Sequence, residues 1–441
     1  METTSSEFAQ AALQRGRRPR VVHLTTVDLS LTLLLLPQLV AFREAGYDVI
    51  GVSAAGKYVS ALEASGIRHV ALEHSTRAAD VRSDAAAARE FLALCRRLKP
   101  DVVHTHNPKP GVYGRVAACM ARVPVIVNTV HGLYAQPDDP LRRRALVYSL
   151  ERIAATCSDA ELIQNPEDLP VLRKLGIPSR KLHLLGNGVD LTRFDPVRYG
   201  EDRATVRAQL GLETDEVAVG LVGRLVAEKG YREVFNAARR LRVTHPQVRV
   251  LVVGPSDLDK TDAISRTELD RAAAQAGVRF LGMRSDVERL YLAMDVYVLA
   301  SHREGFPRSA MEAAAMGLPI VATDIRGCRQ VVDHDRTGVL IPVRNPARLA
   351  EAIGRLAGNP TLRSELGRAA RAKALSDFDD RQQVRLTLDV YERLLARPRR
   401  GARRRSGYSD DNDTGRSEPV RVLRPGSLRA ALLRGRLPLD P

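Results

Sequence analysis

The fold is predicted most directly from ten residues, REGFPRSAME at positions 303–312. An apolar run at 296–300 precedes them and indicates a buried strand, and residues 310–316 have a helical pattern. The stretch is therefore predicted to be a strand, a tight loop and the start of a helix. Gly305 would let the backbone approach a ligand closely, and the fixed φ angle and missing N–H of Pro307 suit a first helical turn.

Two carboxylates, Glu304 and Glu312, bracket this turn. On one continuous helix they would lie about 80° apart around the axis, so a shared ligand requires Glu304 to lie on the loop. For an isolated pair at this spacing, a capped surface helix with two solvated acids is the alternative.

Strands and helices alternate on both sides of this stretch. In the first part we expect strands at 20–26, 48–53, 69–72, 101–106 and 124–129, and helices at 30–45, 58–65, 83–98, 112–121 and 141–156. In the second part we expect strands at 217–222, 248–253, 278–281, 296–300, 320–322 and 338–341, and helices at 231–243, 267–276, 287–293, 330–332, 346–356, 361–374 and 382–395. Strands this apolar predict parallel sheets with helices on both faces.

The predicted fold class is α/β, with two Rossmann-like doubly wound domains facing an interdomain cleft. The turn-rich segment 182–196 is interpreted as the connection between them. The expected parts are a basic disordered N-terminus (1–19), a first domain (20–186), a second domain (187–381), a helix crossing back to the first domain (382–396) and a basic disordered tail (397–441).

Composition favours a cytoplasmic protein. The four cysteines are far apart and lack the paired spacing of a zinc or dithiol site, and no export signal is evident. The apolar run at 31–42 has twelve residues, short of the roughly 20 that span a bilayer, so we predict a buried helix there.

The net charge of +16 would suit nucleic acid, an anionic membrane surface or anionic substrates. The tail from Arg397 onward has twelve Arg and five acidic residues, so it holds +7 of this charge. The chain has no Trp and 4% aromatic residues, which argues against nucleic acid as a partner. We hypothesise that the tail, which interleaves Leu with Arg, holds the protein peripherally at the anionic inner face of the cell membrane; a solvated extension is the alternative.

A second candidate motif is GLVGRLVAEKG at 220–230, which follows the first strand of the second domain. Its glycines allow close backbone approach, and Arg224 and Lys229 lie beside a predicted helix N-terminus, which favours anions. The motif therefore suits a diphosphate, although a Gly-rich loop with basic residues is common without any ligand.

Together these motifs resemble a known family. GRL at 223–225, KG at 229–230, EGFP at 304–307 and Glu312 look like the retaining glycosyltransferases of family 4, which have the GT-B fold, over about residues 20–396. The resemblance implies an enzyme of the hexosyltransferase type that uses a nucleoside-diphosphate sugar, expected to be UDP-linked, as substrate.

The resemblance also implies roles for single residues. Arg224 and Lys229 would hold the diphosphate, Glu304 would contact the donor sugar, and Glu312 would bind the ribose hydroxyls. The donor sugar would also face backbone groups of Gly305, Phe306 and Pro307.

The first domain is similar to the capsule and exopolysaccharide branch of the family in HTHNPK at 104–109, TVHG at 129–132 and QNPED at 164–168. This implies that His131 faces the donor sugar, and that the acceptor is a glycan, lipid-linked through polyprenyl diphosphate or otherwise. His104 and His106 alternate along a strand; metal binding would need both on one face with further ligands, and a structural role is preferred.

Two departures matter. Many relatives have a Gly-Gly loop after the first strand, whereas this chain has TTVDLS at 25–30, so no contacts are carried over to that loop. Asp333 and Asp335 superficially form a metal-binding Asp-x-Asp pattern, but they precede a turn, and we expect no metal and no cofactor.

Two rival functions remain open. Sugar-nucleotide epimerases share the two-domain fold, but they would consume a nucleotide sugar without an acceptor. A polyanion-binding protein led by the basic tail would lose its function when 397–441 is deleted, whereas a transferase would keep its chemistry.

Overall fold

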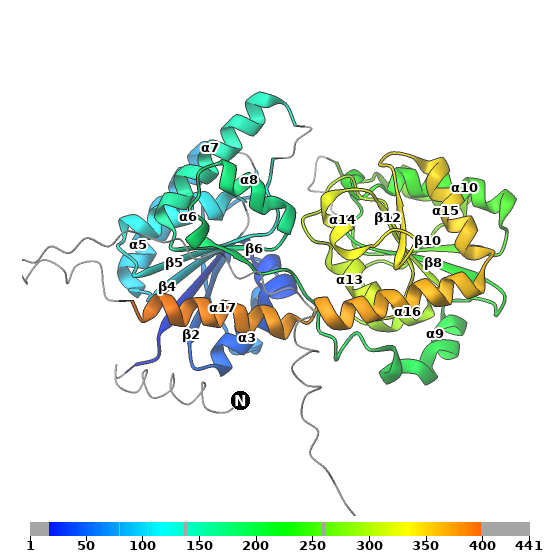
Figure 1. Ribbon diagram of the computed structural model, residues 1–441, viewed down its shortest axis with the longest axis horizontal. Helices are drawn as coiled ribbons and strands as arrows, with labels where there is room; N and C mark the ends of the chain where they lie inside the picture. The colour runs from blue at the N-terminus through cyan, green and yellow to red at the C-terminus, as the bar shows by residue number, and fades with distance from the viewer. Residues whose placement is uncertain (1–16, 79, 107, 136–138, 257–261, 398–441) are drawn as a thin grey trace, which may run out of the picture. The chain divides into compact units, whose positions relative to one another are not determined.

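A computed structural model of the chain describes residues 17–78, 80–106, 108–135, 139–256 and 262–397 (Figure 1). The described residues up to Leu395 form one compact unit, which contains two β-sheets. The expectations about the N-terminus before position 17 and about the basic tail from position 398 concern residues outside this described part. Among the described residues, no helix combines the length and apolar character that crossing a membrane requires.

The described residues of the first half form a seven-stranded sheet in the order β3-β2-β1-β4-β5-β6-β7, and every neighbouring pair is parallel. The strands are β1 Arg20–Val27, β2 Asp48–Ala54, β3 Arg68–Ala71, β4 Val102–His106, β5 Val125–Val130, β6 Ala160–Ile163 and β7 Leu182–Leu184. The chain winds outward in one direction from β1 and in the other from β4. Open parallel sheets bind ligands at such a switch point, beyond the carboxyl ends of the strands.

Helices cover both faces of this sheet. Successive residues of β1 point to opposite faces, so Val21 packs with Phe42 in one core cluster while Val22 packs with Phe91 in another. The helices of this half are α2 Asp28–Ser30, the π-helical η1 Leu31–Leu35, α3 Leu36–Glu44, α4 Val59–Ala64, α5 Val81–Leu98, α6 Pro108–Met120, α7 Leu141–Cys157, the short η2 Pro166–Asp168, α8 Leu169–Lys174 and η3 Ser179–Lys181.

The second half repeats this plan. Its described residues form a six-stranded sheet in the order β10-β9-β8-β11-β12-β13, again with parallel neighbours. The strands are β8 Val217–Val222, β9 Val248–Val253, β10 Arg279–Phe280, β11 Val296–Leu299, β12 Ile320–Thr323 and β13 Gly338–Ile341. The helices are η4 Pro196–Asp202, α9 Arg203–Gln209, η5 Ala227–Lys229, α10 Tyr231–Thr244, α11 Arg266–Ala276, α12 Val287–Ala293, α13 Arg308–Ala315, α14 Arg326–Val331, α15 Pro346–Ala357 and α16 Pro360–Asp377.

The last helix, α17 Asp380–Leu395, follows the second sheet in sequence but packs on the first (Figure 1). Tyr391 and Leu394 belong to the same core cluster as Val21 and Phe42. The Tyr391 hydroxyl also lies 2.5 Å from Nδ1 of His104 on β4. The final helix therefore completes the core of the first half.

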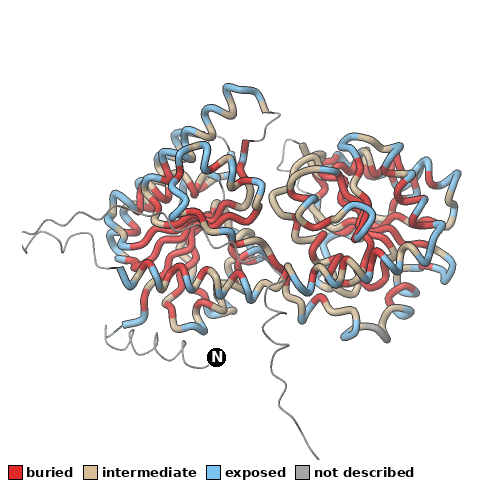
Figure 2. Tube along the Cα trace, viewed as in Figure 1, coloured by how far each residue is buried: buried red, intermediate tan, exposed pale blue. Residues whose placement is uncertain are grey.

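The predicted pair of parallel-sheet, Rossmann-like halves is confirmed, and Figure 2 shows that the strands of both are largely buried. Three details were wrong. The segment 182–196, interpreted as a connection, begins with strand β7; strand β6 and helices α8 and α9 were not predicted; and the run 31–42 is not a uniformly buried helix. It starts with a π-helical turn whose Leu33 and Leu34 are exposed, because such a turn buries one side of the helix.

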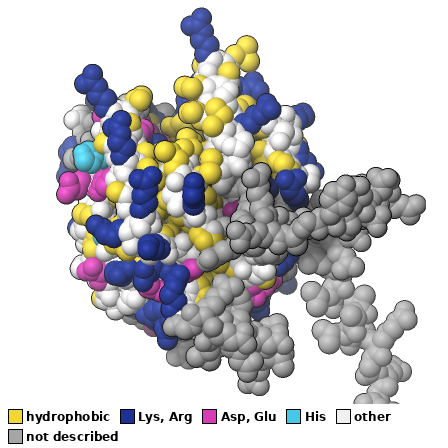
Figure 3. Space-filling model, turned by 90° about the vertical axis from the view of Figure 1, so that its left-hand side faces the viewer, with side chains coloured by type: hydrophobic (Ala, Val, Ile, Leu, Met, Phe, Trp, Pro, Cys, Tyr) yellow, Lys and Arg dark blue, Asp and Glu magenta, His cyan; other side chains and the backbone are white. Residues whose placement is uncertain are grey.

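The surface of the first half combines apolar and basic side chains. Figure 3 shows hydrophobic side chains interleaved with Lys and Arg on the side that it draws. Helix α7 contributes to this character through exposed Leu141, Leu146, Leu150 and Ile153.

Candidate active site

Two loops of the second half meet at the switch point of its sheet. Strands β8 and β11 are neighbours in the sheet, so the loop that begins at Gly223 and the loop that contains Glu304 leave the same edge side by side. The predicted motifs, 80 residues apart in the chain, are thus brought together by the topology. Arg224 and Lys229 both lie on the first of these loops and are partly exposed.

An ion pair joins the two loops. The Lys229 ammonium lies 2.6 Å from Oε1 of Glu304, and the Ser301 hydroxyl donates to the same oxygen at 2.7 Å. Gly230 makes this close packing possible, because its φ is +74° and a Cβ there would lie 2.0 Å from the Ala300 carbonyl oxygen. Because the Lys229 side chain is more exposed than that of Glu304, an anionic ligand can reach the ammonium group and replace the carboxylate as its partner.

Two helix N-termini lie beside this ion pair in sequence. Helix α10 starts after Gly230 and α13 starts after Pro307, and within the described residues neither start has a side-chain cap. Their first N–H groups therefore remain available to hydrogen-bond an anion. Helix α13 begins at Arg308, so Glu304 lies on the loop that precedes it. A ligand shared by Glu304 and Glu312 requires this placement.

Glu312 has a different environment from Glu304. It lies within α13, and the Tyr291 hydroxyl donates to its Oε2 at 2.9 Å. Burial raises the pKa of Glu312, while Arg308 opposes that shift. Phe306, between the two acids, packs its ring edge-on against Phe378, with the centroids 5.9 Å apart.

His131 follows β5 in the first half and joins a row of histidines. Its Nδ1 lies 3.1 Å from the Gln164 side-chain oxygen, and its Nε2 lies 3.1 Å from Nδ1 of His106, which in turn contacts His23 at 3.0 Å. Burial lowers the pKa of His131 to about 4, so its ring is neutral at pH 7. Both ring nitrogens thus have partners within the first half, and it is the backbone of His131 that faces the Glu304 loop.

The two halves touch at that backbone. A Cβ on Gly305 would lie 1.9 Å from the His131 carbonyl oxygen, and one on Gly132, where φ is +115°, would lie 2.8 Å from the Gly305 Cα. Asn165, which follows β6, donates from its side chain to the Gly305 carbonyl at 2.8 Å, and Asn187 donates to the Phe306 carbonyl at 3.1 Å. The loop at 304–307 is therefore held in place by hydrogen bonds from the side chains of Asn165 and Asn187.

A second contact between the halves was not predicted. Arg326, at the start of α14, donates to the Leu133 carbonyl at 2.6 Å and pairs with Asp168. The other Asp168 oxygen accepts from the Leu133 amide at 3.0 Å. The sequence signal for Asn165 and Asp168 was the QNPED motif, to which no role had been attached.

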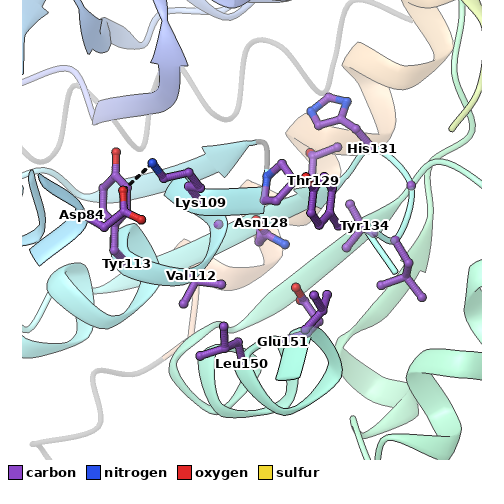
Figure 4. Close-up of a pocket in the computed structure, with 16 residues that line it drawn as sticks. Asp84, Lys109, Val112, Tyr113, Asn128, Thr129, His131, Tyr134, Leu150 and Glu151 are labelled. Atoms are coloured by element: carbon purple, nitrogen blue, oxygen red, sulfur yellow. Dashed lines mark ion pairs between the residues drawn. The ribbon is translucent and has the colours of Figure 1, made fainter. Parts of the chain in front are cut away.

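A pocket of about 290 Å³ opens beside His131 in the first half (Figure 4). It runs between the ends of β5, helix α6 and helix α7. Its walls include His131, Tyr134, Val112 and Leu150. A group bound there would lie next to the Gly132–Gly305 contact.

Two sets of side chains have donor atoms that could bind a metal ion: three histidines of the first half and the carboxylates of the Asp-x-Asp pattern. Donor atoms of His23, His104 and His106 lie within 4.8 Å of one another, but both nitrogens of His104 already contact Tyr391 and Thr129. Burial holds the pKa values of these histidines low, so they are neutral. The carboxylates of the Asp-x-Asp pattern are instead paired, Asp333 with Lys373 and Asp335 with Arg355.

Comparison with known proteins agrees with this geometry. Residues 38–193 match the family described as Glycosyltransferase Family 4, and residues 202–373 match the family described as Glycosyl transferases group 1. The first match begins after strand β1 and includes β2 to β7, and the second includes all six strands of the second sheet.

The similarity to individual relatives extends over most of the chain. The UDP-Gal:alpha-D-GlcNAc-diphosphoundecaprenol alpha-1,3-galactosyltransferase of Escherichia coli is 30% identical over 303 residues, which cover 68% of this chain and 76% of that protein. The capsular polysaccharide biosynthesis glycosyltransferase CapM of Staphylococcus aureus is 26% identical over 82% of this chain and 94% of its own. The structure of Anabaena HepE in complex with UDP and glucose is similar in fold, with a TM-score of 0.72 at 20% identity over 85% of this chain and 100% of that one. The chain therefore belongs to the family 4 glycosyltransferases and has the GT-B fold.

Proposed function

We propose that this enzyme transfers a sugar, with retention of anomeric configuration, from a UDP-linked donor to a hydroxyl of a lipid-linked or other glycan acceptor in cell-surface polysaccharide synthesis. The observation that carries the proposal is the Lys229–Glu304 ion pair at the switch point of the second sheet. In this proposal the second half, residues 187–381, binds the donor, and the first half, residues 20–186, binds the acceptor.

The donor diphosphate takes the place of Glu304 as the partner of Lys229. Arg224 and the uncapped starts of α10 and α13 supply further positive potential at the same edge. Departure of the nucleotide concentrates negative charge on the phosphate oxygen that leaves, so cations already in place there lower the barrier. The displaced Glu304 is then free to accept a hydrogen bond from the donor sugar.

Glu312 binds the ribose of the donor. Its carboxylate accepts a hydrogen bond from Tyr291 on one side, and its other oxygen is available for a ribose hydroxyl. Backbone groups at 305–307 line the donor sugar, and neutral His131 faces it through its backbone carbonyl rather than as a charged base.

In the chemical step, the acceptor oxygen bonds to the anomeric carbon on the face from which the diphosphate leaves. The bond from the anomeric carbon to the phosphate oxygen breaks, its electron pair stays with that oxygen, and the oxygen takes the acceptor's proton. Lys229 and Arg224 stabilise the charge meanwhile, so the reaction needs no metal and no covalent enzyme intermediate.

The acceptor class is inferred from relatives. The Escherichia coli relative is named for a GlcNAc-diphosphoundecaprenol acceptor, and a Campylobacter jejuni relative, 25% identical over 85% of this chain, is named for a diphospho-undecaprenol acceptor. An acceptor of this kind would approach from the first half, where the pocket beside His131 lies.

The test begins with a screen of nucleotide sugars for binding, followed by assays of acceptor-dependent nucleotide release. Lys229→Ala or Arg224→Ala should lower turnover about a hundredfold, which corresponds to about 3 kcal/mol of lost transition-state stabilisation. Arg266→Ala, which removes an exposed surface charge of the same half, is the matched control and should leave turnover unchanged. Near-normal turnover of the Arg224→Ala, Lys229→Ala double variant would defeat the proposal.

The rival functions give different results in the same assay. An epimerase would convert the nucleotide sugar without an acceptor and would release no nucleotide. A polyanion-binding protein would consume no nucleotide sugar, and its binding would disappear when the tail from position 397 is deleted.

A further inference from the structure

His302 lies two residues before Glu304 on the same loop, and it contacts the neighbouring loop through both its main chain and its ring. Its backbone amide donates to the carbonyl of Glu228, the residue before Lys229, at 2.8 Å. Its ring Nε2 lies 3.0 Å from Oε1 of Glu233, which belongs to the first turn of α10. A carboxylate oxygen accepts hydrogen bonds, so Nε2 carries the proton and donates. His302 therefore connects its own loop both to the residue before Lys229 and to the helix that follows.

These two contacts do not depend on the ion pair between the loops. The exposed fraction of the side chain is 21% for His302 and 16% for Glu233, and neither contact uses an atom of the Lys229–Glu304 pair. In the proposed function the donor opens that ion pair, because its diphosphate takes the place of Glu304. The main-chain bond from His302 to Glu228 can then still hold the two loops together.

The position of Glu233 in its helix gives this side chain an alternative. It is the third residue of α10, and from this position a Glu side chain can fold back to the start of its own helix. Helix α11 of the same half uses that alternative: its third residue, Glu268, accepts from the backbone amide of Ser265 at 3.0 Å. In α10 the carboxylate instead bonds to His302, and no side chain of the described residues caps the helix start.

The direction of the Glu233 side chain matters for the binding of an anion. The proposed function assigns the diphosphate of the donor to Lys229, Arg224 and the helix starts. A carboxylate folded back over the start of α10 would occupy N–H groups that the diphosphate needs, and its charge would repel the phosphates. Loss of the His302 ring would release Glu233 for that movement.

We propose that His302 is a positioning residue of the donor site. Its ring holds Glu233 away from the start of α10, so the diphosphate of the donor does not compete with this carboxylate. Its main chain keeps the two loops together while Lys229 exchanges Glu304 for the diphosphate. The inference rests on the proposed function, because it concerns the same donor site.

The test is calorimetric titration of the full chain with UDP and with inorganic pyrophosphate, together with steady-state kinetics of nucleotide release. His302→Ala should raise the Kd of both ligands and the donor KM about tenfold, which is the effect of one hydrogen bond to a charged group. Its kcat should change less than about threefold, because the ground state and the transition state lose the same binding energy. His302→Gln should bind both ligands like the parent, since its amide can donate to Glu233.

A second substitution, Glu233→Gln, separates this role from a merely structural one. Added to His302→Ala, it should restore the Kd of UDP to within about threefold of the parent, because the released side chain no longer carries a charge. On its own it should leave UDP binding near that of the parent, since the amide oxygen still accepts from His302. If the ring had only a structural role, the double variant would bind UDP as weakly as His302→Ala.

The matched control is His74→Ala. It removes another contact between a histidine and a glutamate, at 3.3 Å from Nδ1 of His74 to Oε2 of Glu90 in the first half, and it should leave UDP binding unchanged. Urea unfolding of each variant detects a loss of folding. Such a loss would lower kcat as well, and Glu233→Gln would not repair it.

Two results would overturn the inference and leave the proposed function standing: UDP binding by His302→Ala that equals the parent's, or a double variant that binds no better than His302→Ala. Failure of the proposed function gives a different result. The parent chain would then bind neither UDP nor pyrophosphate, Lys229→Ala would change nothing, and the inference about His302 would fall with the donor site.

Discussion

Replacing Gly305 by Ala tests whether the close approach of the two halves is part of the working enzyme. The new Cβ would lie 1.9 Å from the His131 carbonyl oxygen, whereas such contacts are essentially never shorter than 3.0 Å, so the gap has to widen by about 1.1 Å. The obstacle is a backbone atom, which cannot turn aside as a side chain would. A displacement of this size between donor and acceptor sides should lower kcat/KM about a hundredfold. The strain should lower the free energy of unfolding by about 1–3 kcal/mol.

The assay is steady-state nucleotide release with the donor identified by the screen, together with calorimetric titration of UDP and urea unfolding. UDP binding should change little, because Lys229, the proposed diphosphate ligand, is not among the atoms nearest to the added Cβ. Gly358→Ala is the control, since Gly358 has an ordinary helical φ and an added Cβ there would meet its nearest atom at 3.5 Å. Adding His131→Ala should not rescue the variant, because the clash is with the main chain. A kcat/KM within threefold of the parent would refute the reasoning.

Three further predictions concern the interior of the two halves. Glu304→Gln should chiefly slow transfer and Glu312→Gln should chiefly weaken UDP binding; equal effects of both variants on both parameters would contradict their separate roles. Tyr391→Phe keeps the ring but removes the hydroxyl 2.5 Å from His104, so urea unfolding should show a loss of about 1–3 kcal/mol with unchanged kcat. Burial lowers the pKa of His23 to about 3 from an ordinary value of 6.5. Between these two pH values, His23 is protonated in the unfolded chain and neutral in the folded chain. Stability should therefore fall as pH is lowered from 7 to 5, by about 2 kcal/mol from His23, and the slope should be shallower in His23→Phe.

The alternation of strands and helices could be predicted because each half is a parallel sheet buried on both faces. Strands such as Val217–Val222 are continuous apolar runs between amphipathic helices, and such runs are easy to recognise. Strand β7 could not be found in this way. It has three residues, one of them the polar His183, and it becomes a strand because β6 offers it a free edge.

Part of the candidate site could also be predicted from the sequence. Parallel strands end at one edge, so the meeting of Lys229 and Glu304 follows from the order of the motifs once their strands are neighbours. The partner of Glu312 could not be predicted, because Tyr291 comes from a different helix and its reach depends on how α12 packs on α13. The surroundings of His131 likewise depend on His106 at the end of β4 and on Gln164 just after β6, which no local pattern encodes.

The packing of α17 on the first sheet has a consequence for how the protein is made. Tyr391 and Leu394 fill the core that β1 and α3 begin, so the first half stays incomplete on the ribosome until the whole second half has been translated. At about 5–20 residues per second, the interval of about 200 residues between β7 and α17 takes roughly 10–40 s. During that time Phe42 lacks its native contact with the Tyr391 ring. We therefore expect the nascent chain to bind chaperones that shield apolar surface, and we expect a chain that stops shortly before α17 to aggregate although it contains the strands of both sheets.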